Sequence, residues 1–272
     1  MHRYLLKVGQ LTVYSYGAML ALAFICGAFF SVRRARQQGL DANKILDLIF
    51  VILIFSVAGA RIFFVALNWD YYGKNLLEVL KVWEGGLVFY GGLIAGLAAT
   101  ALFLKKHRIS FGIAADTLSP GLAIGIAVGR VGCFLNGCCW GKISYRFGVC
   151  FPAKDAPGPF AQQVYDGLIS PAAGWSLPVL PTQLYESVAC LAIFFVLILI
   201  EKRKTFDGFL FWSFVALYSI ARFFIEGLRY YEPNFFMGKL TVSQGVSLVL
   251  FVLALCVLTA GSLRKRSIPR KS

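Results

Sequence analysis

The chain has 272 residues, of which 58% are hydrophobic, and its mean hydropathy is +0.72. These values exclude an ordinary soluble domain and indicate that lipid is the solvent for most of the surface. A net charge of +14 would suit nucleic acid, but the cations lie beside apolar segments, where membrane topology and anionic headgroups account for them, so we expect no nucleic-acid partner.

Runs of about 20 apolar residues predict helices that cross a hydrocarbon core roughly 30 Å thick. We therefore expect an all-α integral membrane protein, one polytopic domain over residues 1–272, that crosses the bilayer about seven times. The first run lacks a small-residue cleavage site, so we interpret it as a retained span. The predicted spans are Val13–Ser31, Ile45–Leu67, Gly86–Leu104, Gly112–Cys133, Thr182–Ile200, Gly208–Gly227 and Thr241–Leu263.

The distribution of lysine and arginine indicates which loops stay in the cytoplasm. Fifteen of the 27 cations lie in the turns after the first, third and fifth spans and in the C-terminal tail, and nine are spread over the longer segments between them. This alternation predicts an N-terminus outside the cytoplasm and a C-terminus inside it.

Two segments on the outer side do not have the pattern of a span. Residues 68–84 combine helical spacing with Trp69, Tyr71 and Tyr72, which suit headgroup depth, so we expect an arm lying in the interface. Residues 143–181 are rich in proline and glycine and predict a small extracytoplasmic cap of irregular structure.

Three arginines lie in spans or at their ends, where a charge is costly and is a functional candidate by default. They are Arg61, Arg130 and Arg222, and Glu226 follows Arg222 at the i+4 spacing that favours an ion pair. The purely structural interpretation of that pair stays open. Glycines around Arg130 and Asn136 would let the backbone approach a ligand whose phosphate or ester oxygens these side chains bind.

Four cysteines, Cys133, Cys138, Cys139 and Cys150, cluster near the outer face. Adjacent cysteines are awkward ligands for one tetrahedral ion and no histidine lies nearby, so we expect no metal. A disulfide between Cys150 and Cys138 or Cys139 is an alternative to a packing role in an oxidising compartment.

The combined motifs are similar to those of the bacterial prolipoprotein diacylglyceryl transferase family, and their order and spacing agree over nearly the whole chain. No single motif would suffice for this resemblance. The residues that carry it are Tyr14–Gly17, Gly59–Arg61, Trp83–Gly86, Tyr90–Leu93, Asp116, Gly129–Gly141, Pro181–Glu186, Tyr218, Arg222, Glu226 and Arg229.

The resemblance implies transfer of the diacylglyceryl group of phosphatidylglycerol to the lipobox cysteine of a preprolipoprotein, with release of glycerol 1-phosphate, in the bacterial cytoplasmic (inner) membrane. Its expected partners are this lipid, lipobox signal peptides and membrane lipids, and it implies no cofactor. The expected catalytic residues are Arg130, Arg222, Tyr90, Tyr16 and Glu226. Arg130, Asn136, Gly141, Tyr218, Arg61 and Arg229 are expected to bind substrate.

The chain departs from the common family pattern at three positions. Tyr90 stands where many members have histidine, Cys133 where asparagine is common, and Cys138 where an acid is common. A free phenol titrates near pH 10, about 3 units above neutrality, so the base that takes the thiol proton stays open. The alternatives from other classes are a transporter and a non-catalytic paralogue that binds lipid or lipoprotein.

Overall fold

The computed structural model describes residues 4–8, 11–81, 85–154, 158–231, 236–237 and 240–266. Its contacts divide the chain into two compact units. Unit 1 comprises Met1–Phe30 and Ala115–Ser272, and unit 2 comprises Ser31–Ala114. Helix α1 (Ser15–Gln37) begins in unit 1 and ends in unit 2.

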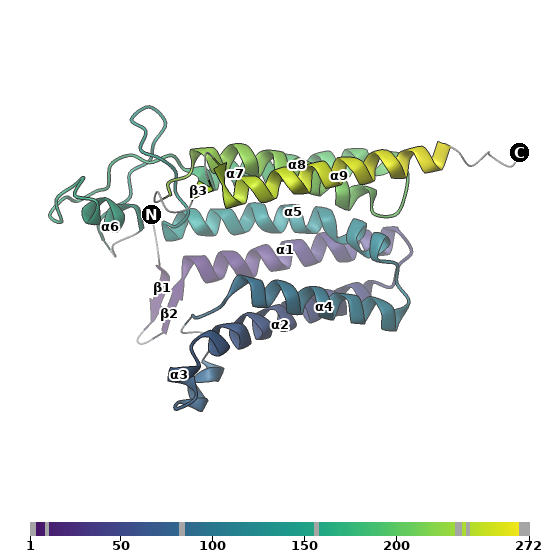
Figure 1. Cartoon of the computed structure of the whole chain (residues 1–272), viewed down its shortest axis with the longest axis horizontal. Coiled ribbons are helices and arrows are strands. Elements are labelled where there is room, and N and C mark those ends of the chain that lie inside the picture. The colour runs from purple at the N-terminus through teal and green to yellow at the C-terminus, as the bar shows by residue number, and fades with distance from the viewer. Residues whose placement is uncertain are drawn as a thin grey trace, which may run out of the picture. The chain divides into compact units, whose positions relative to one another are not determined.

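Unit 1 is a bundle of long helices. In Figure 1, α5 (Phe111–Asn136) runs beside α7 (Thr182–Ile200), α8 (Phe209–Leu228) and α9 (Val242–Arg266), and α8 packs against both α7 and α9. Ala123, Leu197 and Leu210 are fully buried at the centre of its apolar core. The core is therefore built from side chains of α5, α7 and α8.

Unit 2 is built on the pair α2 (Ala42–Leu67) and α4 (Phe89–His107). The two backbones approach closely because both helices present glycine: a Cβ atom on Gly59 would lie 2.6 Å from the carbonyl oxygen of Gly91. Small residues at such contacts are typical of helices that associate in lipid.

The arm that follows α2 consists of α3 (Trp69–Tyr72) and the 3-10 helix η1 (Leu76–Leu80). Leu76, Leu77 and Leu80 are exposed, as are the rings of Trp69 and Tyr71. The Tyr71 hydroxyl donates to Glu78 at 2.6 Å, and this bond, with the ammonium of Lys81, lowers the pKa of the Glu78 carboxyl. The predicted arm extends to residue 84, and its last three residues lie outside the described part of the chain.

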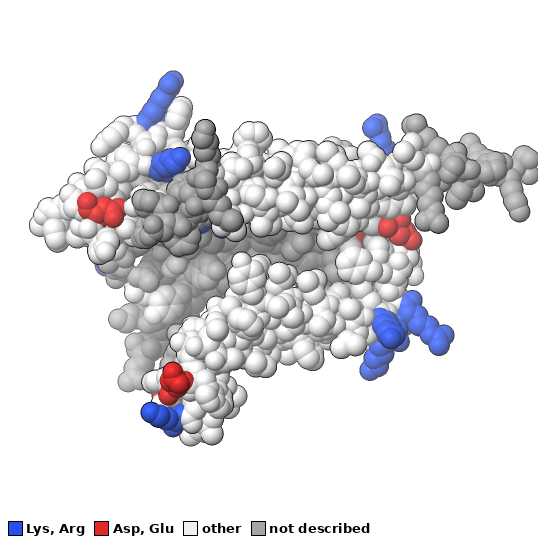
Figure 2. Space-filling model, viewed as in Figure 1, with Lys and Arg blue, Asp and Glu red and all other residues white. Residues whose placement is uncertain are grey.

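The prediction of an all-α multi-pass membrane protein is confirmed. Within the described residues, six helices are long and apolar enough to cross a membrane: α1, α2, α5, α7 with η3 (Glu201–Arg203), α8 and α9. The predicted span Gly86–Leu104 corresponds to α4, which has nineteen residues and ends in Lys105, Lys106 and His107. Figure 2 shows the charged side chains near the ends of the long helices and on the segments beyond them, with other residues over the middle of the visible helices.

Short strands and a small helical segment complete the fold. The hairpins β1–β2 (Tyr4–Val8, Leu11–Tyr14) and β3–β4 (Phe236–Met237, Leu240–Thr241) were not predicted from the sequence. The predicted cap contains α6 (Gly158–Tyr165) and isolated bridges such as Pro152 to Trp175 around the buried Phe151.

Asp116 joins α5 to the start of α8. Its fully buried carboxylate accepts hydrogen bonds from the backbone N–H groups of Gly208 and Phe211 at 2.8 and 3.0 Å, and Lys204 pairs with it at 3.1 Å. Backbone N–H groups at a helix start have no partner within the helix, so the carboxylate caps α8. Asp116 therefore positions the helix that carries Tyr218, Arg222 and Glu226.

Candidate active site

Glu186, on the second turn of α7, is the shared acceptor of a polar cluster inside unit 1. Its Oε1 accepts from Nη2 of Arg130 at 2.8 Å and from the hydroxyl of Tyr218 at 2.8 Å, and its Oε2 accepts from Nη1 of Arg222 at 3.0 Å. The Glu186 side chain is 3% exposed. One buried carboxylate thus holds donors from α5 and α8 together.

Glu226 is the second buried carboxylate, with its side chain 1% exposed. It pairs with Nη2 of Arg222 at 2.8 Å, which confirms the ion pair predicted from the i, i+4 spacing, and with Arg229 at 3.5 Å. The Tyr231 hydroxyl donates to it at 2.6 Å, and burial together with this bond raises the pKa of Tyr231 to about 12. Tyr231 therefore stays a protonated donor at neutral pH.

Among the residues that the structure describes, the cluster carries three positive and two negative charges. Arg130, Arg222 and Arg229 outnumber Glu186 and Glu226, and the arginine side chains are 20%, 15% and 14% exposed. A buried charge is tolerated where it is paired, and these ion pairs leave an excess of one positive charge. The site is therefore complementary to a ligand with a single negative charge.

The end of α5 and the turn after it lie beside this cluster. Tyr16, on the first turn of α1, lies near enough to Arg130 and Cys133 for electrostatic interaction with both. Asn136 ends α5, and its side-chain amide makes no hydrogen bond to another described residue.

Gly141 lies where the turn meets the start of α7 and the end of α8. A Cβ atom there would be 2.7 Å from both the Leu180 Cβ and the Leu228 carbonyl oxygen, so any larger residue would push these segments apart. The Gly141 N–H donates to Leu180 at 2.9 Å. Gly141 therefore contacts the ends of the helices α7 and α8, which carry Glu186 and Arg222.

The family model described as prolipoprotein diacylglyceryl transferase matches residues 3–260. The chain belongs to this family. The phosphatidylglycerol–prolipoprotein diacylglyceryl transferase of Listeria innocua is 34% identical over 251 residues, which cover 92% of this chain and 86% of the relative. A protein of the same name from Thermosynechococcus vestitus is 32% identical over 91% of this chain and 88% of the relative. Another, from Geobacillus kaustophilus, is also 32% identical, over 94% of this chain and 90% of the relative.

Arg61 and Tyr90, two further residues expected from the sequence, lie in unit 2. The Arg61 guanidinium is buried and donates to the carbonyl oxygens of Glu78, Val79 and Gly85 at 2.7 to 2.9 Å. Its contacts are thus with the arm backbone. Tyr90, on the first turn of α4, is 65% exposed and packs edge-on against Phe89.

Glu186 was not among the site residues expected from the sequence, although it lies in the Pro181–Glu186 motif. It is an acid inside a predicted apolar span, and the rule that selected the three arginines also applies to a carboxylate at membrane depth. That signal would have found it. Trp83 and Glu84 of the family pattern lie outside the described residues.

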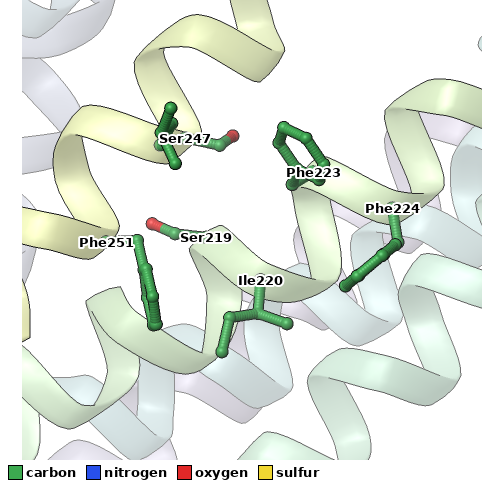
Figure 3. A pocket seen from close by; sticks show the side chains of 7 residues that line it. Ser219, Ile220, Phe223, Phe224, Ser247 and Phe251 are labelled. Carbon is green, nitrogen blue, oxygen red and sulfur yellow. The ribbon is translucent and has the colours of Figure 1, made fainter.

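A groove on the seam between α8 and α9 begins one turn from Arg222. Arg222 Nε lies 3.3 Å from Ser243 of α9, and Ser247 on the next turn of α9 lines the groove together with Ser219 and Phe223 of α8. Figure 3 shows the two serine hydroxyls between the helices, among the apolar side chains of Ile220, Phe224 and Phe251. None of the described residues that line the groove has an ionisable side chain.

Proposed function

We propose that this protein transfers the diacylglyceryl group of phosphatidylglycerol to the lipobox cysteine thiol of preprolipoproteins, the first step of lipoprotein maturation. The product is a thioether, and glycerol 1-phosphate leaves. The observation that carries the proposal is that Arg130 and Arg222 converge on one buried carboxylate, Glu186, in a chain of the prolipoprotein diacylglyceryl transferase family.

Charge complementarity supports this lipid as the substrate. The phosphodiester of phosphatidylglycerol carries one negative charge, and the cluster has one positive charge in excess. Guanidinium groups present paired N–H donors that match phosphate oxygens, so Arg130 and Arg222 are the proposed phosphate ligands. Asn136, Tyr218 and Arg229 complete the proposed lipid site. Gly141 supports the site indirectly, through its close contacts with Leu180 and Leu228.

The reaction forms one bond and breaks one. The cysteine sulfur attacks the glycerol carbon that bears the phosphate ester, and the bond between that carbon and the phosphate oxygen breaks. The bonding electrons leave with glycerol 1-phosphate, so negative charge on the phosphate grows in the transition state. Arginines fixed by Glu186 and Glu226 stabilise this charge without reorganising.

The thiol must also lose its proton. Tyr90 in its ionised, tyrosinate form is the proposed acceptor, because it occupies the position where many family members have histidine. Tyr16 is proposed to hydrogen-bond the reacting groups. Glu226 is the other candidate. The Glu226 carboxylate already accepts hydrogen bonds or ion pairs from Arg222, Arg229 and Tyr231, which leaves Tyr90 as the more accessible group.

Both substrates stay in the membrane. The groove between α8 and α9 offers an apolar path for an acyl chain beside Arg222, so lipid would enter sideways. The proposed location is the bacterial inner membrane, with the C-terminus in the cytoplasm and the arm (68–84) and cap (143–181) on the outer side. The proposed role of Arg61 is to hold the arm in place for substrate entry.

Purified protein incubated with phosphatidylglycerol and a lipobox peptide tests the function directly. Mass spectrometry should find the diacylglyceryl increment on the peptide cysteine, and Arg130→Ala and Arg222→Ala should each lower the rate about 100- to 1000-fold, which corresponds to roughly 2.7–4 kcal/mol. Arg146, an exposed cap cation over the Phe147 ring, gives the control variant Arg146→Ala, which should keep the rate.

Two outcomes contradict the proposal. A peptide that gains no lipid from the folded wild-type protein would favour the non-catalytic paralogue or the transporter. Normal rates in both arginine variants would remove the phosphate assignment. Elution as a monodisperse peak in detergent shows whether each variant is folded before its rate is compared.

A further inference from the structure

Three cysteine sulfurs converge at the outer end of α5. Cys133 lies on the last turn of α5, and Cys138 and Cys139 lie in the turn that follows. Their sulfur atoms are all within 4.8 Å of one another, and the three side chains are half-buried free thiols. The transfer reaction proposed above uses none of them.

The backbone around these thiols is fixed from several directions. The N–H of Cys138 donates to the Cys133 carbonyl at 3.1 Å, Gln183 donates to the Cys138 carbonyl at 2.6 Å, and Thr182 donates to the Cys139 carbonyl at 2.8 Å. The first residues of α7 thus hold the carbonyl groups of both cysteines. The positions of the sulfurs follow from a constrained turn, which is the preorganisation that a ligand set requires.

The conformation of Cys139 removes the objection that adjacent cysteines cannot share an ion. Along an extended chain, neighbouring side chains point to opposite sides. Cys139 has φ +61° and Gly137 has φ +73°, so the chain turns sharply on both sides of Cys138. A left-handed conformation is uncommon for a residue other than glycine or asparagine, and such outliers persist at functional sites where the surroundings impose them.

The electrostatic surroundings suit a site with net negative charge. Arg130 and Arg229 both act on the Cys139 sulfur through Coulombic interaction. Three thiolates around a divalent ion leave one negative charge, and the Coulombic attraction of these nearby guanidinium groups lowers its cost. A thiolate site without neighbouring cations would be costly at this depth.

We propose that Cys133, Cys138 and Cys139 form a binding site for one thiophilic metal ion of the zinc(II) and copper(I) class. Each thiol gives its proton to solvent as its sulfur binds the ion. Zinc–sulfur bonds of about 2.3 Å in a tetrahedral site place sulfurs about 3.8 Å apart, so the cluster closes by side-chain movements of about 1 Å or less. The ion would tie α5 to the turn that packs on α7, independently of the transfer reaction.

Metal content and absorption of the purified, reduced full-length protein test the site. After incubation with zinc chloride and removal of free metal, elemental analysis by inductively coupled plasma mass spectrometry should find about one zinc ion per chain. Cadmium in place of zinc should give thiolate-to-metal charge-transfer absorption. Cys133→Ser, Cys138→Ser and Cys139→Ser should each lose most of the bound metal, whereas Cys256→Ser on α9 should keep it.

Alkylation of the wild-type protein gives a second reading that does not depend on whether a variant folds. Zinc should protect Cys133, Cys138 and Cys139 from a maleimide reagent, while the exposed Cys150 reacts equally with and without metal. Three results would each overturn the proposal. The thiols could react equally with and without zinc, the protein could retain no metal, or two of the three cysteines could form a disulfide in place of binding metal. Transfer activity enters neither measurement, so failure of the proposed function leaves this test unaffected.

Discussion

Glu186 accepts hydrogen bonds or ion pairs from Arg130, Tyr218 and Arg222, and it is the residue on which two helices of the cluster converge. A carboxylate in this position both neutralises and aims the arginines. Removing one partner of a buried ion pair costs roughly 3–5 kcal/mol, because the remaining charge is left uncompensated. The positions of Arg130 and Arg222 therefore depend on a residue that need not touch the substrate.

We expect Glu186→Gln to lower the transfer rate by about 100-fold, the loss that a misplacement of about 1 Å produces in reacting groups. The amide keeps the size of the side chain and one acceptor oxygen but loses the charge. Rate and thermal unfolding in detergent are the measurements, with Glu201→Gln in η3 as the control. A variant with normal rate and normal unfolding temperature would show that Glu186 does not position the arginines.

Tyr90→Phe separates proton transfer from packing, because it keeps the ring and removes the hydroxyl. If Tyr90 accepts the thiol proton, turnover should fall about 100-fold or more, within the span usual for general acid–base groups. The pH–rate profile of Tyr90→His should shift toward the lower pKa of imidazole. Full activity of Tyr90→Phe across the pH range would eliminate this role and leave Glu226 or solvent as the acceptor.

The polar contacts that hold the arm to α2 come from the Arg61 side chain. Arg61 donates four hydrogen bonds to carbonyl oxygens of the arm and the following segment, and its guanidinium lies 5.6 and 5.2 Å from the ring centroids of Phe64 and Tyr72. Within the described residues, the arm buries no side chain of its own. Its stability therefore depends on this contact.

We expect Arg61→Leu to loosen the arm while the helices of unit 2 stay intact. Leucine keeps part of the apolar stem and supplies no donor, so four carbonyl oxygens lose their partner. Hydrogen exchange or limited proteolysis should show faster reaction confined to residues 69–81, and Lys74→Leu, with an exposed cation in the same arm, should not. Equal exchange in wild type and Arg61→Leu would exclude Arg61 as the anchor.

At the scale of the whole molecule, orientation is set by charge. Lys105 and Lys106 lie in the last turn of α4 and Arg108 follows its end, and the exposed Cys150 lies in the cap between α5 and α7. Cations beside a span resist translocation, so the loop after α4 should be cytoplasmic and the cap extracytoplasmic.

A membrane-impermeant maleimide applied to intact cells, or to spheroplasts where an outer membrane is present, should label Cys150. A cysteine introduced by Arg108→Cys, in a chain that also carries Cys150→Ser, should be labelled only after permeabilisation, as judged by mass spectrometry of the peptide that contains position 108. Labelling of the loop after α4 from outside would reverse the proposed topology.

The membrane fold, the approximate positions of seven helices and the pair between Arg222 and Glu226 can be predicted from the amino-acid sequence alone. These depend on local quantities: the length of an apolar run, the cost of a charge in lipid, and the i, i+4 geometry of one helix. The family resemblance can also be recognised from the sequence, because it depends on the order and spacing of motifs along the chain.

Which charges meet could not be predicted without the folded structure. Three features depend on contacts between segments far apart in the chain: Arg130 and Arg222 share Glu186, Asp116 caps α8, and Arg61 holds the arm. The hairpins were missed because strands of two to five residues leave too short a pattern to detect. Periodicity fixes which face of a helix is apolar, whereas the partner of each buried charge is chosen by how the helices pack.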